Sequence, residues 1–124
     1  MSHDSDKRKV LCVCIGGTVR SVGIKDVLNG TYNCDALAAS AIWQSDETLR
    51  MLCEWADLIV PVVPRDWPHH ACPERDNKRW MESVMWDSKY DGKRKVLNVG
   101  EDVWCNARHP ELRALILSKI GELL

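Results

Sequence analysis

The chain has 124 residues, and 17 basic side chains nearly balance 18 acidic ones, so the length suits one domain around one core. No strongly cationic field is available to hold nucleic acid, and no apolar run is long enough to span a membrane. The polar residues 1–8 lack the apolar stretch of a signal peptide and are expected to form a disordered arm before a domain over 9–124. We therefore expect a cytoplasmic protein with neither a nucleic-acid nor a membrane partner.

The predicted elements alternate between strands and helices along the chain. Apolar runs rich in β-branched residues predict strands over 10–15, 57–63 and 95–99. A weaker pattern predicts one more strand over 33–39. Helical spacing of apolar residues, with Ser45 or Asp46 as a cap and Pro110 in a first turn, predicts helices over about 21–28, 46–56, 77–86 and 110–123. This order predicts right-handed crossovers and a parallel sheet between helices.

Six cysteines in a short chain raise the question of disulfides. Cys12 and Cys14 alternate with valines in a strand pattern, and Cys53 falls inside a helical one, so we expect reduced thiols in core or catalytic positions. The run from His69 to Cys72 invites a zinc hypothesis. It has no second ligand pair at suitable spacing, so no metal site is predicted.

Cys14 ends the first predicted strand and opens a C-x5-R-S sequence that leads into a helix. Backbone N–H groups in a tight loop form an anion nest, and the positive end of the following helix adds to it. Arg20 offers a planar fork for two phosphate oxygens, and the Ser21 hydroxyl can bond a Cys14 thiolate. Five loop residues are expected to bind phosphate through their backbone: Ile15, Gly16, Gly17, Thr18 and Val19. These residue types together indicate in-line attack by a thiolate on a phosphate monoester.

The loop resembles that of the low-molecular-weight protein tyrosine phosphatases, whose signature V-C-x-G-N-x-x-R-S directly follows the first strand. Residues 54–60 look like the W-A-D-L-I segment of short bacterial and phage members, and residues 95–112 are similar to their strand, acid loop and final helix. The resemblance implies a three-layer α-β-α fold with a four-stranded parallel sheet, the flavodoxin-like phosphatase I fold. It also implies hydrolysis of phosphotyrosine proteins or small aryl phosphates through a phosphocysteine on Cys14, with no cofactor and no metal.

The family's acid loop reads D-P-Y or D-D-Y, whereas this chain has Glu101-Asp102-Val103-Trp104. Asp102 matches best as the general acid that protonates the leaving oxygen, and Glu101 is the alternative. Trp43 and Trp104 either wall a slot for an aromatic ring or serve as ordinary packing. Gly17 stands where the family has a bracing Asn, and Val19 where some members carry a second, protective cysteine.

Other functions are compatible with the same loop. Arsenate reductases share the fold and the C-x5-R loop, but the further cysteines Cys53, Cys72 and Cys105 do not form the closely spaced pair that their relay uses. Phosphocarrier subunits of sugar transport systems phosphorylate a strand-end cysteine but usually lack the arginine. The third alternative is a catalytically inactive module that binds phosphate or phosphotyrosine, which the unusual acid loop leaves open.

Overall fold

The computed structural model describes residues 7–16, 19–67, 72–100 and 103–123. Within these ranges the strands are β1 (Lys9–Cys14), β2 (Asp35–Ser40) and β3 (Leu58–Pro61). The α-helices are α1 (Arg20–Thr31), α2 (Asp46–Trp55), α3 (Glu74–Met81) and α4 (Pro110–Lys119). Three short 3-10 segments complete the described part: η2 (Val84–Trp86), η3 (Ser88–Lys93) and η4 (Ile120–Glu122). None of these helices has both the length and the apolar character needed to cross a membrane.

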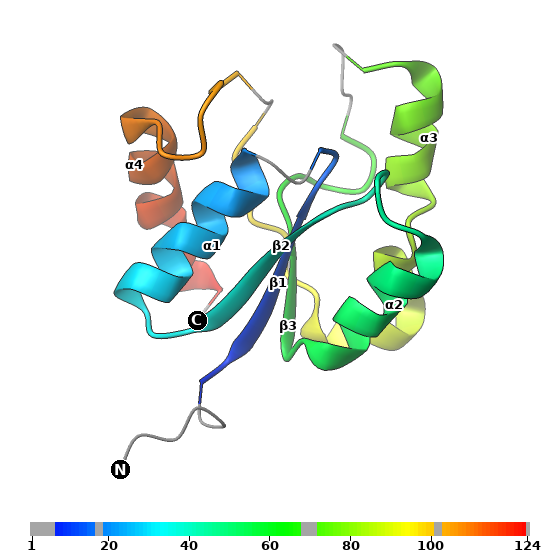
Figure 1. The fold of residues 1–124 in the computed structure, drawn as a ribbon, viewed down its shortest axis with the longest axis horizontal. Coiled ribbons are helices and arrows are strands. Elements are labelled where there is room, and N and C mark those ends of the chain that lie inside the picture. Colours follow the sequence, from blue (N-terminus) through cyan, green and yellow to red (C-terminus); the bar gives the residue numbers. More distant parts are fainter. Residues whose placement is uncertain (1–6, 17–18, 68–71, 101–102, 124) are drawn as a thin grey trace.

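The three strands form one parallel sheet in the order β2-β1-β3, so β1 is its central strand. Helices α1 and α4 lie on one side of the sheet, and α2 lies on the other side with α3 above it (Figure 1). Every residue from Val10 to Cys14 is at most 2% exposed, because β1 is covered on both faces and on both edges. The expected α/β class, with a parallel sheet between helices, is therefore what the structure shows.

The expected fourth strand is not a regular strand in the described residues. Residues 95–99 run beside β3, and three of their N–H groups donate to β3 or its extension, from Lys95 to Ile59, from Leu97 to Pro61 and from Val99 to Val62. A parallel ladder also needs donors from the neighbouring strand. Pro61 accepts from this segment but has no N–H to return, so the pairing stays one-sided at the carboxyl end of β3.

Helices α1, α2 and α4 lie where the sequence predicts them, with ends that differ by up to four residues, and the remaining helix is displaced. Ser45 caps α2 by accepting from the Thr48 N–H, and Pro110 lies in the first turn of α4, as predicted. The helix expected over 77–86 instead occupies Glu74–Met81. Ser83 accepts a hydrogen bond from the Met85 N–H and so starts a separate 3-10 turn, because a serine side chain can take a backbone donor away from a helix.

Helices α1 and α4 approach each other closely at Gly23. A Cβ atom there would lie 3.0 Å from the Ala107 carbonyl oxygen and 3.2 Å from side-chain atoms of Leu112 and Ile116. Both of these α4 side chains are fully buried. The absence of a side chain at Gly23 thus lets α4 and the segment before it rest directly on α1.

We predict that Gly23→Val lowers the free energy of unfolding by about 1–3 kcal/mol, because the Ala107 backbone must move to admit the side chain. Gly30→Ala is the matched control in the same helix, since nothing lies within 4 Å of its Cβ position. It should leave stability unchanged or raise it by up to about 1 kcal/mol. Urea denaturation measures both, and equal stability of the Gly23→Val variant and the parent would contradict this packing.

Candidate functional site

The sulfur of Cys14 lies at the carboxyl end of β1, where ligands bind in open parallel sheets. Its Sγ atom is 3.1 Å from the Ser21 Oγ, and both side chains are buried. The spacing of seven residues brings them together because the chain turns after β1 and enters α1 at Arg20. The expected pairing of a strand-end cysteine with the serine of the C-x5-R-S sequence is present in the structure.

Helix α1 begins without a side-chain cap. Val19 occupies the N-cap position, no described side chain accepts from the first-turn N–H groups, and no acidic residue lies in that turn. The starts of α2 and α4 differ, since Ser45 and His109 each accept a backbone N–H there and acidic residues follow. The first N–H groups of a helix need a partner and favour a negative one. The start of α1 is therefore suited to an external anion.

Arg20, the first residue of α1, is only 2% exposed. One guanidinium nitrogen donates to the Gly100 carbonyl oxygen at 2.8 Å, while the buried Nε has no hydrogen-bond partner. No carboxylate pairs with Arg20 among the described residues. A buried charge needs a counter-charge to offset its desolvation. An anion bound beside Cys14 would supply that counter-charge to the guanidinium.

Gly100 was not predicted from the sequence as part of the site. Its φ of +76° is a left-handed conformation that glycine adopts readily, and its N–H donates to the Asn98 side chain at 2.9 Å. This turn aims the Gly100 carbonyl at Arg20. The link joins the segment after 95–99 to the loop that follows β1, although the two lie 80 residues apart in sequence.

Ser40, at the end of β2, braces the first turn of the Cys14 loop. Its hydroxyl donates to the Ile15 carbonyl and accepts from the N–H groups of Ile42 and Trp43, at 3.0 and 2.9 Å. The Ala41 N–H also donates to the Cys14 carbonyl at 2.9 Å. The turn that carries Trp43 is therefore bonded directly to the end of β1. Trp43 itself is 75% exposed, an unusual position for so large an aromatic side chain.

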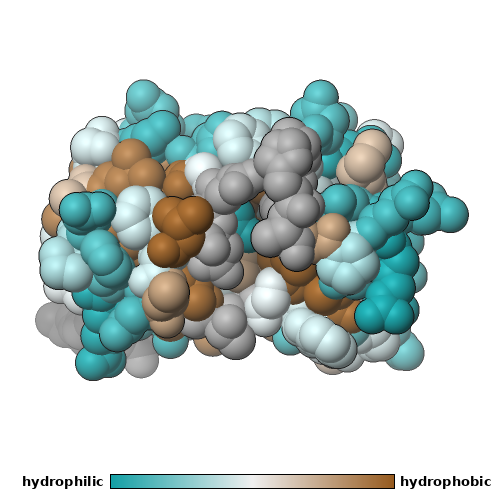
Figure 2. Space-filling view, turned by 90° about the horizontal axis from the view of Figure 1, so that it is seen from above, coloured by the Kyte–Doolittle hydropathy of each residue, from teal (hydrophilic) through white to brown (hydrophobic). Residues whose placement is uncertain are grey.

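Trp104 is half-buried and packs on the core, and its ring centroid lies 5.4 Å from that of His109. Its indole Nε1 is buried without a hydrogen-bond partner. Both tryptophans come from loops at the end of the molecule where β1 terminates. Figure 2 looks onto this end of the molecule, where hydrophobic patches lie among hydrophilic side chains.

Three of the other cysteines are buried thiols with raised pKa values. Burial raises the pKa of Cys12 well above its ordinary range, and it raises the pKa of Cys53 to about 11. Burial also raises the pKa of Cys34. These three thiols stay protonated at neutral pH and serve as small core residues. No disulfide joins any of the six cysteines, all of which lie in the described part of the chain.

Four predicted site residues lie outside the described residues, namely Gly17, Thr18, Glu101 and Asp102. His69 and His70, for which no metal site was predicted, also lie outside them. Of the remaining loop residues, Ile15 is buried, while Gly16 and Val19 are partly exposed. No protein-family model, no curated protein and no solved structure matches this chain. The function is therefore inferred from the geometry at Cys14 and from the sequence of its loop.

We predict that Gly100→Ala weakens the binding of inorganic phosphate, measured by calorimetry, and also lowers stability by about 1–2 kcal/mol. A Cβ is unfavourable at this positive φ, and the turn that aims the carbonyl at Arg20 must shift. Gly92→Ala is the control, because nothing lies within 4 Å of its Cβ position. Unchanged phosphate affinity in Gly100→Ala, with reduced stability, would show that this carbonyl does not position Arg20.

Proposed function

We propose that this chain is a phosphatase of the low-molecular-weight protein tyrosine phosphatase type, which hydrolyses aryl phosphate monoesters and above all phosphotyrosine. One observation carries the proposal. A buried arginine with an unpartnered Nε and a cysteine–serine pair converge on an uncapped helix start. Segment 95–99 beside β3 is compatible with the four-stranded flavodoxin-like sheet of that family, with one-sided pairing at Pro61.

The proposed reaction has two displacements at phosphorus. The phosphoryl group binds to the backbone N–H groups after Cys14 and to the fork of Arg20. The Cys14 thiolate attacks, the S–P bond forms and the P–O bond to the aryl group breaks. Asp102 gives its proton to the departing aryl oxygen. A water molecule, deprotonated by the same carboxylate, then attacks phosphorus and releases phosphate, and the departing sulfur is stabilised by the Ser21 hydroxyl 3.1 Å away.

The alternatives receive less support from the structure. A relay of the arsenate reductase kind needs accessible thiols near the nucleophile, whereas Cys53 is fully buried with its pKa raised by that burial. Cys105 is exposed. An inactive phosphate-binding module would use the same loop, and turnover alone separates it from an enzyme.

We predict that Cys14→Ser abolishes the hydrolysis of p-nitrophenyl phosphate but keeps the binding of inorganic phosphate, because Arg20 and the start of α1 remain. Cys105→Ser is the matched control, since it removes an exposed thiol and should leave the rate unchanged. Arg20→Lys should also lose activity, because a point charge cannot replace the planar fork. Near-normal turnover by the Cys14→Ser variant would eliminate the mechanism.

We predict that Asp102→Asn slows phosphocysteine formation by about 10²–10⁴-fold for phosphotyrosine and only weakly for p-nitrophenyl phosphate, whose leaving group needs little protonation. Single-turnover kinetics are required, because hydrolysis of the intermediate can limit both substrates at steady state. Glu101→Gln is the control. A leaving-group dependence in Glu101→Gln but not in Asp102→Asn would move the assignment to Glu101, and its absence from both would mean that this loop supplies no acid.

A further inference from the structure

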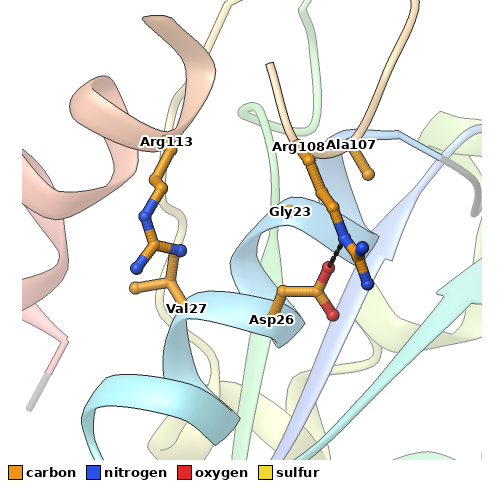
Figure 3. A pocket seen from close by; sticks show the side chains of 6 residues that line it. All are labelled: Gly23, Asp26, Val27, Ala107, Arg108 and Arg113. Atoms are coloured by element: carbon orange, nitrogen blue, oxygen red, sulfur yellow. Dashed lines mark ion pairs between the residues drawn. The ribbon is translucent and has the colours of Figure 1, made fainter. Parts of the chain in front are cut away.

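A cavity lies between α1 and α4, away from Cys14. Its volume is about 420 Å³, and it is lined by Gly23, Asp26, Val27, Ala107, Arg108 and Arg113. Figure 3 shows Arg113 reaching from α4 and Arg108 from the segment before it, with Val27 and Asp26 beneath their guanidinium groups.

The floor of this cavity follows from the spacing of α1. Residues 23, 26 and 27 are three and four apart, so they share one face of the helix. Because Gly23 has no side chain, the Ala107 backbone approaches α1 at this point. The next residue, Arg108, is thereby placed over Asp26, with its Nε 3.8 Å from a carboxylate oxygen.

The charges around the cavity are not balanced. Asp26 contacts both Arg108 and Lys25, the latter at 3.7 Å. The Arg113 side chain makes no hydrogen bond and no ion pair with the described part of the chain, although its backbone N–H donates to the His109 carbonyl. Lys25 and Arg108 therefore share one carboxylate and Arg113 has none, which leaves two positive charges in excess beside an apolar floor at Val27.

We propose that this cavity binds a phosphoryl group, either free or carried on a larger molecule, between Arg108 and Arg113. A phosphoryl dianion matches the excess charge, and each guanidinium presents a planar fork to its oxygens. Arg108 is 86% exposed, and an exposed ion pair is weak, so it can leave Asp26 at little cost. Lys25 then still neutralises Asp26. This inference does not depend on the proposed function.

The test is a residue-resolved titration of the full chain by ¹H–¹⁵N NMR, with inorganic phosphate and phenylphosphonate as probes. We expect saturable shifts of the Val27, Ala107 and Arg113 amides. Signals of Val19 and Arg20 report the Cys14 loop separately, so failure of either site is seen independently of the other. Equal affinity for the two probes identifies free phosphate as the ligand, and tighter phenylphosphonate binding identifies a phosphoryl group on an apolar body that rests on Val27.

Substitutions test whether Arg108 and Arg113 bind the probes. Arg108→Ala and Arg113→Ala should each weaken binding by about tenfold, the usual loss for a charge-assisted hydrogen bond. Arg113→Lys should recover only part of it, because the fork is lost. Arg75→Ala is the control, since that side chain is 81% exposed and lies elsewhere, on α3. Shifts that fail to saturate, or that persist unchanged in Arg113→Ala, would overturn the proposal.

Discussion

The buried charge of Arg20 is the constraint on which the rest of the candidate site depends. Arg20 is 2% exposed, and among the described residues its guanidinium donates to the Gly100 carbonyl while its Nε finds no acceptor. Burying a cation without a carboxylate costs free energy that packing elsewhere must offset. The cost is recovered when an oxyanion binds. Because α1 also starts without a cap at this residue, two unsatisfied positive features meet at the same place.

The scaffold holds this site rigidly. Cys14 ends the central strand and pairs with Ser40 of β2, while β3 pairs with β1 as far as Val13, so the backbone that carries the sulfur is held from both edges. Ser40 secures the next carbonyl, that of Ile15, from the end of β2. Gly100 secures Arg20 from the segment beside β3. Hydrogen bonds from the neighbouring strands, from Ser40 and from Gly100 thus position the loop backbone and Arg20 before a ligand binds. Such preorganised donors are the condition for electrostatic stabilisation of a transition state.

Much of this arrangement could be predicted from the sequence, because it depends on residue types and spacings that the sequence shows directly. The apolar run before Cys14 and the C-x5-R-S spacing placed the Cys14–Ser21 pair, and the two candidate caps Ser45 and Asp46 marked the start of α2. The irregular pairing of 95–99 was missed, since it arises from the missing N–H of Pro61 in a neighbouring strand. The Arg20–Gly100 bond was also missed, because a backbone carbonyl leaves no residue-type signature. Only a glycine after that segment hinted at a turn.

The central claim is that Cys14 forms a covalent bond to phosphorus. Its most direct measurement is a rapid acid quench during turnover of an aryl phosphate, followed by mass spectrometry of the intact chain and its peptides. The account predicts a phosphoryl group attached to Cys14 in the parent protein and none in Cys14→Ser. Turnover with no phosphorylated protein at any quench time, or a phosphoryl group on another residue, would contradict it.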